Sequence, residues 1–215
     1  PRERLLLSIL QAAGWPIIPL VLCSVVAMAL IVERFLTLRA AKVAPSRLVD
    51  EVISVTRASL PTADTIQKLA DNSVLGQVLA QGLQTAADGR ISEERLRAGL
   101  EAAGRQAVHE LERNLNALGT IASAAPLFGL LGTVIGMIEI FAASGGTTSG
   151  SGDPQALAHG ISVALYNTAF GLMVAIPSLM AHRHFRTKVD GFALQMEQSA
   201  DKLSQHLLRL SAGRR

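Results

Sequence analysis

Long apolar runs alternate with polar stretches along this chain of 215 residues. Residues 5–32 and 114–138 contain no Asp, Glu, Lys or Arg, and residues 140–182 contain only Asp153. The hydrocarbon core of a bilayer is about 30 Å thick, so a helix needs about 20 apolar residues to cross it. Each run supplies that length. The pattern therefore predicts three membrane-spanning helices, at residues 17–38, 117–143 and 159–181.

Two amphipathic stripes adjoin the second and third predicted spans. Their apolar residues recur at spacings of three and four, as on one face of a helix. The first stripe follows Ser92, a capping hydroxyl, with Glu93 and Glu94 placed to oppose the helix dipole. A helix running from there through the second span would reach roughly 75 Å, and we expect the two extensions to be antiparallel neighbours. The stripes are Leu96, Leu100, Ala103, Ala107, Leu111, Leu115 and Leu118, and Val189, Phe192, Met196, Ala200, Leu203, Leu207 and Leu210.

The remaining segments complete an all-α organisation. Residues 1–16 are expected to form an interfacial helix, with Trp15 at the level of the lipid headgroups. Residues 39–116 are predicted to be a polar helical insert, and residues 144–158 a short loop rich in glycine and serine. Residues 182–215 are predicted to be a C-terminal helix.

Composition and charge support a membrane protein. The chain is 49% hydrophobic and 17% charged, with a mean hydropathy of +0.35, whereas soluble domains carry about 25% charged residues. The basic residues flank the spans, so we expect a lipid membrane as partner and no nucleic acid. The loop at 144–158 has no Lys or Arg. By the positive-inside rule, the N-terminus and this loop are expected outside, and the insert and C-terminus in the cytoplasm.

Several classes of protein are disfavoured by what the chain contains. Its single cysteine, Cys23, provides neither a disulfide framework nor a zinc site. No nucleophile with an obvious base, phosphate-cradling loop or set of paired metal ligands occurs. We therefore expect no enzymatic activity, no metal and no cofactor. Arg2 and Arg4 before an apolar run are typical of a signal peptide, but this run is too long, and we expect it to be retained.

Small residues mark the second and third spans as interior helices. Small side chains let helix backbones approach closely, which favours association in lipid. Helix packing alone is the simplest interpretation of this pattern, whereas the Leu- and Val-rich first span is expected to face lipid. The candidate packing residues are Ala125, Gly129, Gly132, Gly136, Gly171 and Pro177.

Four polar residues of these two spans are candidates for a proton or ion path. Thr133, Asn167 and Thr168 are the deepest, and each threonine could either bond its own helix or line a path for an ion. Asn167 is costly to leave unpaired, so it should face protein or water. Glu139 is the only carboxylate in the two apolar segments, and its position fits either the ion path or the outer headgroups.

Two motifs lie in these spans: APLFGLLGTVIGM at residues 125–137 and GISVALYNTAFGLMVAIP at residues 160–177. They resemble the ExbB/TolQ/MotA proton-channel family, most closely its ExbB and TolQ branch. The resemblance implies an inner-membrane homopentamer whose second and third spans surround a central pore. That pore would hold an ExbD- or TolR-like single-span partner whose aspartate takes up the proton. It further implies energy transfer through a TonB- or TolA-like protein to the outer membrane, with Thr133 and Thr168 facing the pore.

One position departs from the family pattern. Many ExbB and TolQ members have a glutamate in the third span where this chain has Val163. Either Glu139 substitutes functionally for this missing glutamate, or this branch of the family needs no such acid. The resemblance favours a proton-channel subunit that energises TonB-dependent outer-membrane transport. The alternatives are a TolQ-like role in envelope maintenance, a MotA-like stator and a passive membrane scaffold.

Overall fold

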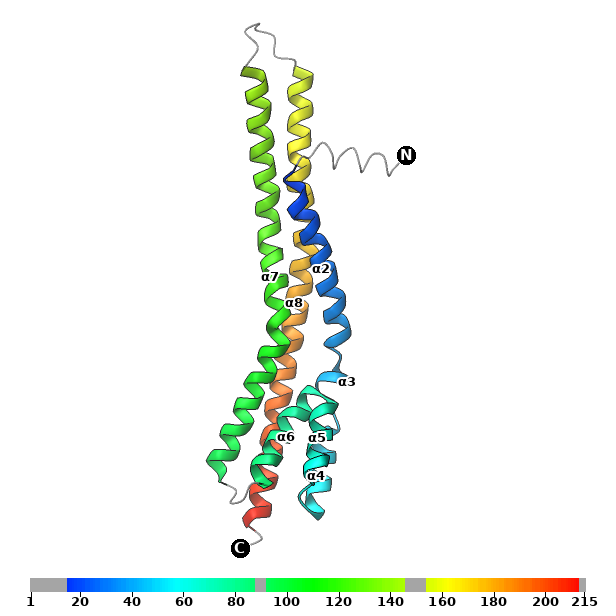
Figure 1. Ribbon diagram of the computed structural model, residues 1–215, viewed down its shortest axis with the longest axis vertical. Coiled ribbons are helices and arrows are strands. Elements are labelled where there is room, and N and C mark those ends of the chain that lie inside the picture. The colour runs from blue at the N-terminus through cyan, green and yellow to red at the C-terminus, as the bar shows by residue number, and fades with distance from the viewer. Residues whose placement is uncertain (1–14, 88–91, 146–153, 213–215) are drawn as a thin grey trace. The chain divides into compact units, whose positions relative to one another are not determined.

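The described residues form helices joined by short connections. The computed structural model describes residues 15–87, 92–145 and 154–212, and no strand occurs in these ranges (Figure 1). The helices are α2 (Ile17–Thr37), α3 (Ala40–Val43), α4 (Leu48–Ala58), α5 (Ala63–Asn72), α6 (Val74–Ala87), α7 (Glu93–Gly145) and α8 (Pro154–Ala212). The all-α prediction is confirmed. Most of the interfacial helix expected at residues 1–16, and the centre of the loop expected at 144–158, lie outside the described residues.

The two long helices run without a break through the predicted spans and amphipathic stripes. Helix α7 contains 53 residues and α8 contains 59. The amide of Leu96 donates to the carbonyl of Ser92 at 3.0 Å, and the acidic Glu93 and Glu94 occupy the first turn of α7. Both features stabilise a helix start. Pro126 and Pro177 lie inside these helices.

The chain divides into two compact units, which share the long helices. The first unit comprises residues 1–32 and 116–183, and the second comprises residues 33–115 and 184–215. Among the described residues, three helices are long and apolar enough to cross a membrane, as predicted: α2, α7 and α8. Their most apolar stretches belong to the first unit.

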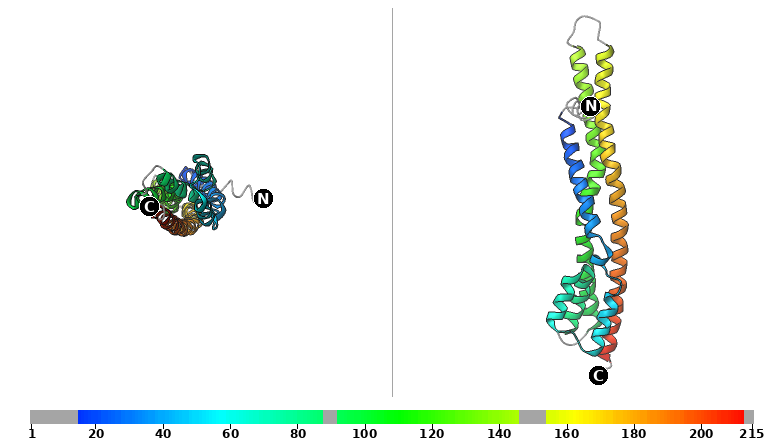
Figure 2. Two further views of the ribbon diagram at one scale, coloured as in Figure 1. Left: turned by 90° about the horizontal axis from the view of Figure 1, so that it is seen from below. Right: turned by 90° about the vertical axis from the view of Figure 1, so that its right-hand side faces the viewer.

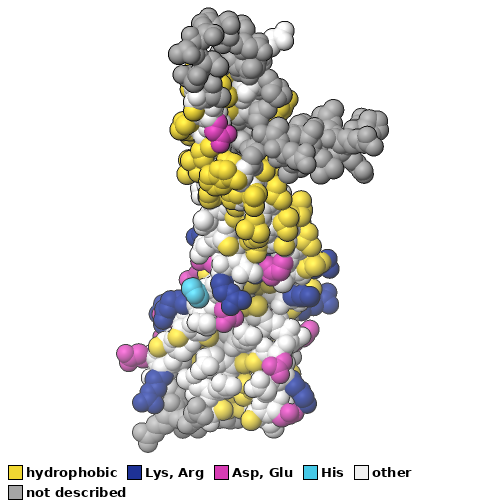
Figure 3. All heavy atoms as spheres, turned by 45° about the horizontal axis from the view of Figure 1, so that its top comes forward, with side chains coloured by type: hydrophobic (Ala, Val, Ile, Leu, Met, Phe, Trp, Pro, Cys, Tyr) yellow, Lys and Arg dark blue, Asp and Glu magenta, His cyan; other side chains and the backbone are white. Residues whose placement is uncertain are grey.

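The first unit has a narrow core and a large apolar exterior. Leu20 of α2, Ala125 of α7, and Val174 and Ala175 of α8 form the buried cluster. Large side chains point outward from the same helices, and Met180 is 69% exposed. On the face drawn in Figure 3, hydrophobic side chains gather in one zone, which also contains an acidic side chain near its upper end, and most charged side chains lie outside it. An apolar exterior around a small-residue interior is the arrangement that lipid favours.

The second unit has a conventional leucine-rich core. Helix α6 packs against both long helices through Gly82, where an added Cβ would lie 2.8 Å from Leu100 and 3.4 Å from Leu203. Phe185 is fully buried and meets Phe35 edge to face, with ring centroids 5.1 Å apart. This packing holds the polar insert against the amphipathic stripes predicted from the sequence.

Candidate functional site

Glycine allows α7 and α8 to approach almost backbone to backbone in the first unit. A Cβ added at Gly171 would lie 2.7 Å from the Ala125 carbonyl oxygen and 3.1 Å from Cα of Gly129. One added at Gly136 would lie 3.2 Å from Cβ of Ala164. Five of the six candidate packing residues, namely Ala125, Gly129, Gly132, Gly136 and Gly171, thus lie in the contact between the two helices. Pro177, by contrast, is exposed on α8.

Thr133 and Thr168 meet across this contact. Their hydroxyl oxygens are 2.6 Å apart, and either can donate to the other. Thr133 Oγ1 also lies 3.1 Å from the carbonyl of Ala164, and Thr168 Oγ1 lies 3.2 Å from the carbonyl of Gly129. Thr133 additionally approaches its own helix at the Gly129 carbonyl, at 3.3 Å. The pair is therefore a half-buried hydroxyl cluster with several acceptors and only two hydroxyl protons to share.

Asn167 is the most buried polar residue at this level. It is 2% exposed, and its side chain packs against Gly132, where an added Cβ would lie 2.9 Å away. A glycine at position 132 therefore creates the space that the amide occupies. Asn167 directly precedes Thr168 on α8, so one turn of this helix carries both polar groups towards α7.

Glu139 does not join the threonine pair. It is exposed on α7, six residues after Thr133. Ideal helix geometry places it about 9 Å further along the axis and about 120° round the helix from Thr133. The structure thus brings together three of the four predicted pathway residues and leaves the carboxylate on another face.

Two further contacts extend the small-residue interface beyond the residues predicted from sequence. Gly119 lies under the His182 imidazole, where an added Cβ would lie 3.0 Å from the ring, and Gly160 lies against the side chain of Ile140. Ser178 is buried and donates to the carbonyl of Val174 at 2.7 Å. The sequence does contain a signal for Gly119 and Gly160, since each is a small residue within an apolar helical segment.

A buried arginine in the second unit was not predicted. Arg34 is 6% exposed and donates to the carbonyl of Leu111 at 3.1 Å and to the Glu33 carboxylate at 2.7 Å. Asn114 donates to the same carboxylate at 3.2 Å. These bonds fasten the end of α2 to α7. From sequence, Arg34 was only one of several basic residues following a span.

One histidine of the second unit is held towards its neutral form. Burial lowers the pKa of His206, and the nearby charges of Arg57 and Arg209 lower it further. Its Nε2 is buried without a hydrogen-bond partner among the described residues. Protonation at this position is therefore disfavoured.

Comparisons with known proteins agree with this architecture. Residues 70–198 match the model of the MotA/TolQ/ExbB proton channel family. The chain is 32% identical over 192 residues to the ExbB-like 3 biopolymer transport protein of Synechocystis, covering 88% of this chain and 89% of that relative. It is 46% identical over 81 residues to the biopolymer transport protein ExbB of Helicobacter pylori, covering 38% of this chain and 54% of the relative.

A further relative belongs to a different named system. The Tol-Pal system protein TolQ of Haemophilus influenzae is 34% identical over 107 residues, covering 50% of this chain and 46% of that protein. The family model covers more than half of the chain, and the Synechocystis relative aligns with nearly all of it. The chain is a membrane protein that belongs to the MotA/TolQ/ExbB proton channel family.

Proposed function

We propose that the chain is the pore-forming subunit of a proton-driven motor in the bacterial inner membrane, and that it energises TonB-dependent transport across the outer membrane. Five copies enclose an ExbD- or TolR-like single-span partner, which transmits movement to a TonB- or TolA-like protein. The observation that carries the proposal is the threonine hydroxyl pair at the glycine-lined contact of two membrane helices, in a chain of a proton-channel family.

The chemistry of the pair supports relay rather than storage of a proton. Either hydroxyl can donate to the other, so Thr133 and Thr168 can reorient their hydrogen bonds as a proton passes. A hydroxyl does not hold a proton or release one at neutral pH, so the partner supplies the titrating carboxylate. Asn167 assists because its polar side chain lies at the same level of the helix pair as the two hydroxyl groups.

Glu139 acts at the outer mouth of the path in this proposal. Its exposure and its distance along the helix from Thr133 place it outside the hydroxyl cluster. A negative charge at the mouth raises the local concentration of cations, and salt screens this effect. Replacement of Glu139 by Gln should therefore lower proton flux only about twofold at low salt, with less effect at high salt.

The proposal is tested by proton flux into liposomes that contain the chain with its co-purified partner and an internal pH-sensitive dye. Thr133→Val and Thr168→Val keep the side-chain shape and remove the hydroxyl. Each should slow flux about tenfold, equivalent to about 1.4 kcal/mol in the barrier. Ser123→Ala is the matched control, because this exposed hydroxyl bonds to the carbonyls of Gly119 and Thr120 in its own helix and to no other described residue.

Equal flux in the two valine variants and the wild type would contradict the role of the pair. Native mass spectrometry of the same samples checks that the copy number is unchanged. A TolQ-like role is the second candidate, favoured by the 34% identity to the Haemophilus protein. Co-purification of a TolR-like rather than an ExbD-like partner would support that role.

A further inference from the structure

The end of α2 and the connection that follows it run along one face of α8 within the second unit. At the start of this segment, the ring of Phe35 stacks on His184, with ring centroids 6.3 Å apart. At its end, the side-chain amide of Gln195 donates to the carbonyl of Ala44, directly after α3, at 3.2 Å. Figures 1 and 2 show α3 beside α8. His184 and Gln195 lie about 20° apart round α8, so residues 35–44 follow a single face of this helix.

Three basic residues gather on this face. Arg39 and Lys42 belong to the segment itself, at the N-cap and within the single turn of α3. Lys188 of α8 lies between the two contacts, about 40° round the helix from His184. All three are exposed, and their side chains form no ion pair or hydrogen bond with another described residue. We call Arg39, Lys42 and Lys188 the basic cluster.

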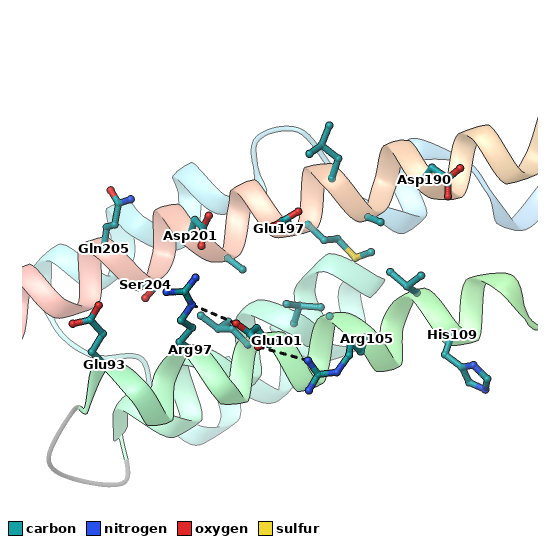
Figure 4. A pocket seen from close by; sticks show the side chains of 18 of the residues that line it. Glu93, Arg97, Glu101, Arg105, His109, Asp190, Glu197, Asp201, Ser204 and Gln205 are labelled. Carbon is teal, nitrogen blue, oxygen red and sulfur yellow. Dashed lines mark hydrogen bonds and ion pairs between the residues drawn. The ribbon is translucent and has the colours of Figure 1, made fainter.

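The acidic residues of α8 in this unit lie on the opposite face of the helix. Asp190, Glu197 and Asp201 line a groove between α7 and α8, where Figure 4 shows them. Helix geometry places them between about 140° and 180° round α8 from Lys188. The described carboxylates of α8 therefore do not neutralise the basic cluster.

The end of α2 is fixed next to the basic cluster and exposes apolar side chains. The buried Arg34 donates to the carbonyl of Leu111 at 3.1 Å and to the carboxylate of Glu33 at 2.7 Å, so this acid is neutralised by Arg34. Phe35 and Leu36, in the last turn of α2, are 55% and 50% exposed. An exposed apolar surface thus adjoins an unpaired cationic one at the point where a helix long enough to span a membrane ends.

We propose that the basic cluster binds the headgroup of an anionic phospholipid, whose acyl chains lie against Phe35 and Leu36. The lipid phosphate accepts charge-assisted hydrogen bonds from the guanidinium and ammonium groups of the cluster. Clustered basic residues next to a span are attracted to anionic lipids. The inference requires only that the chain is embedded in a membrane, so it stands whether or not the chain conducts protons.

The surface fits a lipid better than a free anion. The three basic side chains are exposed, so salt screens their attraction for a small ion in water. A phospholipid is also held by its chains in the bilayer, which keeps its headgroup at the level where the span ends. The apolar side chains of Phe35 and Leu36 would add nothing to the binding of free phosphate.

The test titrates the full chain, purified in a neutral detergent, with phosphatidylglycerol. Native mass spectrometry counts the lipids retained and gives an apparent Kd, and phosphatidylcholine with the same acyl chains serves as the zwitterionic comparison. The triple variant Arg39→Gln/Lys42→Gln/Lys188→Gln should raise the Kd for phosphatidylglycerol about tenfold. Its Kd for phosphatidylcholine should change less than about twofold.

A control triple removes the same charge elsewhere in the second unit. Lys68→Gln/Arg95→Gln/Lys202→Gln alters three exposed positions, and Lys202 lies about 21 Å further along α8 than Lys188. This variant should change the Kd for phosphatidylglycerol less than about twofold. Phosphatidylglycerol should also raise the Tm of the wild type and of the control triple more than that of the cluster triple, because a ligand stabilises the state that binds it.

Three outcomes would overturn the proposal. Equal weakening by both triples would show attraction to net charge alone, and equal weakening for both lipids would show loss of an apolar contact. Displacement of phosphatidylglycerol by inorganic phosphate at constant ionic strength would show a site for free anions. If the cluster triple does not fold, Lys188→Gln alone should raise the Kd about threefold, and an unchanged Kd in that variant would equally refute the assignment.

Discussion

Replacement of Gly171 by alanine tests the close contact that brings the two threonines together. The added Cβ would lie 2.7 Å from the Ala125 carbonyl oxygen and 3.1 Å from Cα of Gly129. Both neighbours are backbone atoms, which cannot rotate aside. The shorter separation is about 0.7 Å below ordinary van der Waals contact, so α7 and α8 must move apart.

The expected cost follows from two opposing effects. Overpacking of a close contact destabilises a protein by about 1–3 kcal/mol, whereas alanine is preferred over glycine within a helix by up to about 1 kcal/mol. Gly171→Ala should therefore lose about 0.5–2 kcal/mol. Gly104→Ala provides the matched comparison, since its Cβ would enter open space and only the helix preference remains. That variant should gain about 0.5–1 kcal/mol.

Thermal unfolding of the two purified variants in one detergent measures the difference. About 1 kcal/mol shifts the Tm of a chain of this size by about 2–4 °C, so Gly171→Ala should melt below the wild type and Gly104→Ala slightly above it. Proton flux should fall together with Tm in Gly171→Ala, because displacement of α8 separates Thr168 from Thr133. A Gly171→Ala protein as stable and active as the wild type would refute the close backbone contact.

Substitutions at three further positions probe the second unit. Phe185→Ala should lower the free energy of unfolding by about 3–5 kcal/mol in denaturant titration, because the ring is fully buried. By the same measurement, Arg34→Met should lower the free energy of unfolding by about 1–3 kcal/mol, because the hydrogen bonds of Arg34 to Leu111 and Glu33 are lost. Arg34→Lys should recover little of this loss, because lysine lacks the guanidinium fork. Burial, aided by the charge of Arg57, lowers the pKa of His206 below its ordinary value of 6.5. The neutral His206 therefore contributes to stability above pH 6.5, and this contribution is lost as the pH falls through the folded-state pKa. A Tm series between pH 8 and 5 should therefore be flatter in His206→Gln, and an unchanged slope would contradict this assignment.

The sequence was informative about single helices and less so about how helices meet. The spans follow from charge-free length, and the run of α7 from Ser92 into the membrane follows from the three-four spacing and the absence of a break. Both are local properties of the chain. Small residues at Gly129 and Gly171 likewise indicate a packed face, because only a close neighbour requires them.

Register between helices was the part that could not be derived. The bond between Thr133 and Thr168 depends on the axial position of α8 relative to α7, and no local pattern sets it to within one turn. Arg34 illustrates the same limit, since its partner Leu111 is 77 positions away.

The position of Glu139 bears on the proton path that we propose. Among the described residues of α7 from 116 onward and of α8 up to 183, it is the only carboxylate, and it lies on a different face of α7 from Thr133. The threonines exchange hydrogen bonds with each other and with backbone carbonyls, but none of these groups titrates near neutral pH. A path built from them can pass a proton only while another group binds and releases it. Because no described carboxylate of this chain lies at the hydroxyl pair, the proposed function requires a partner protein to supply that group.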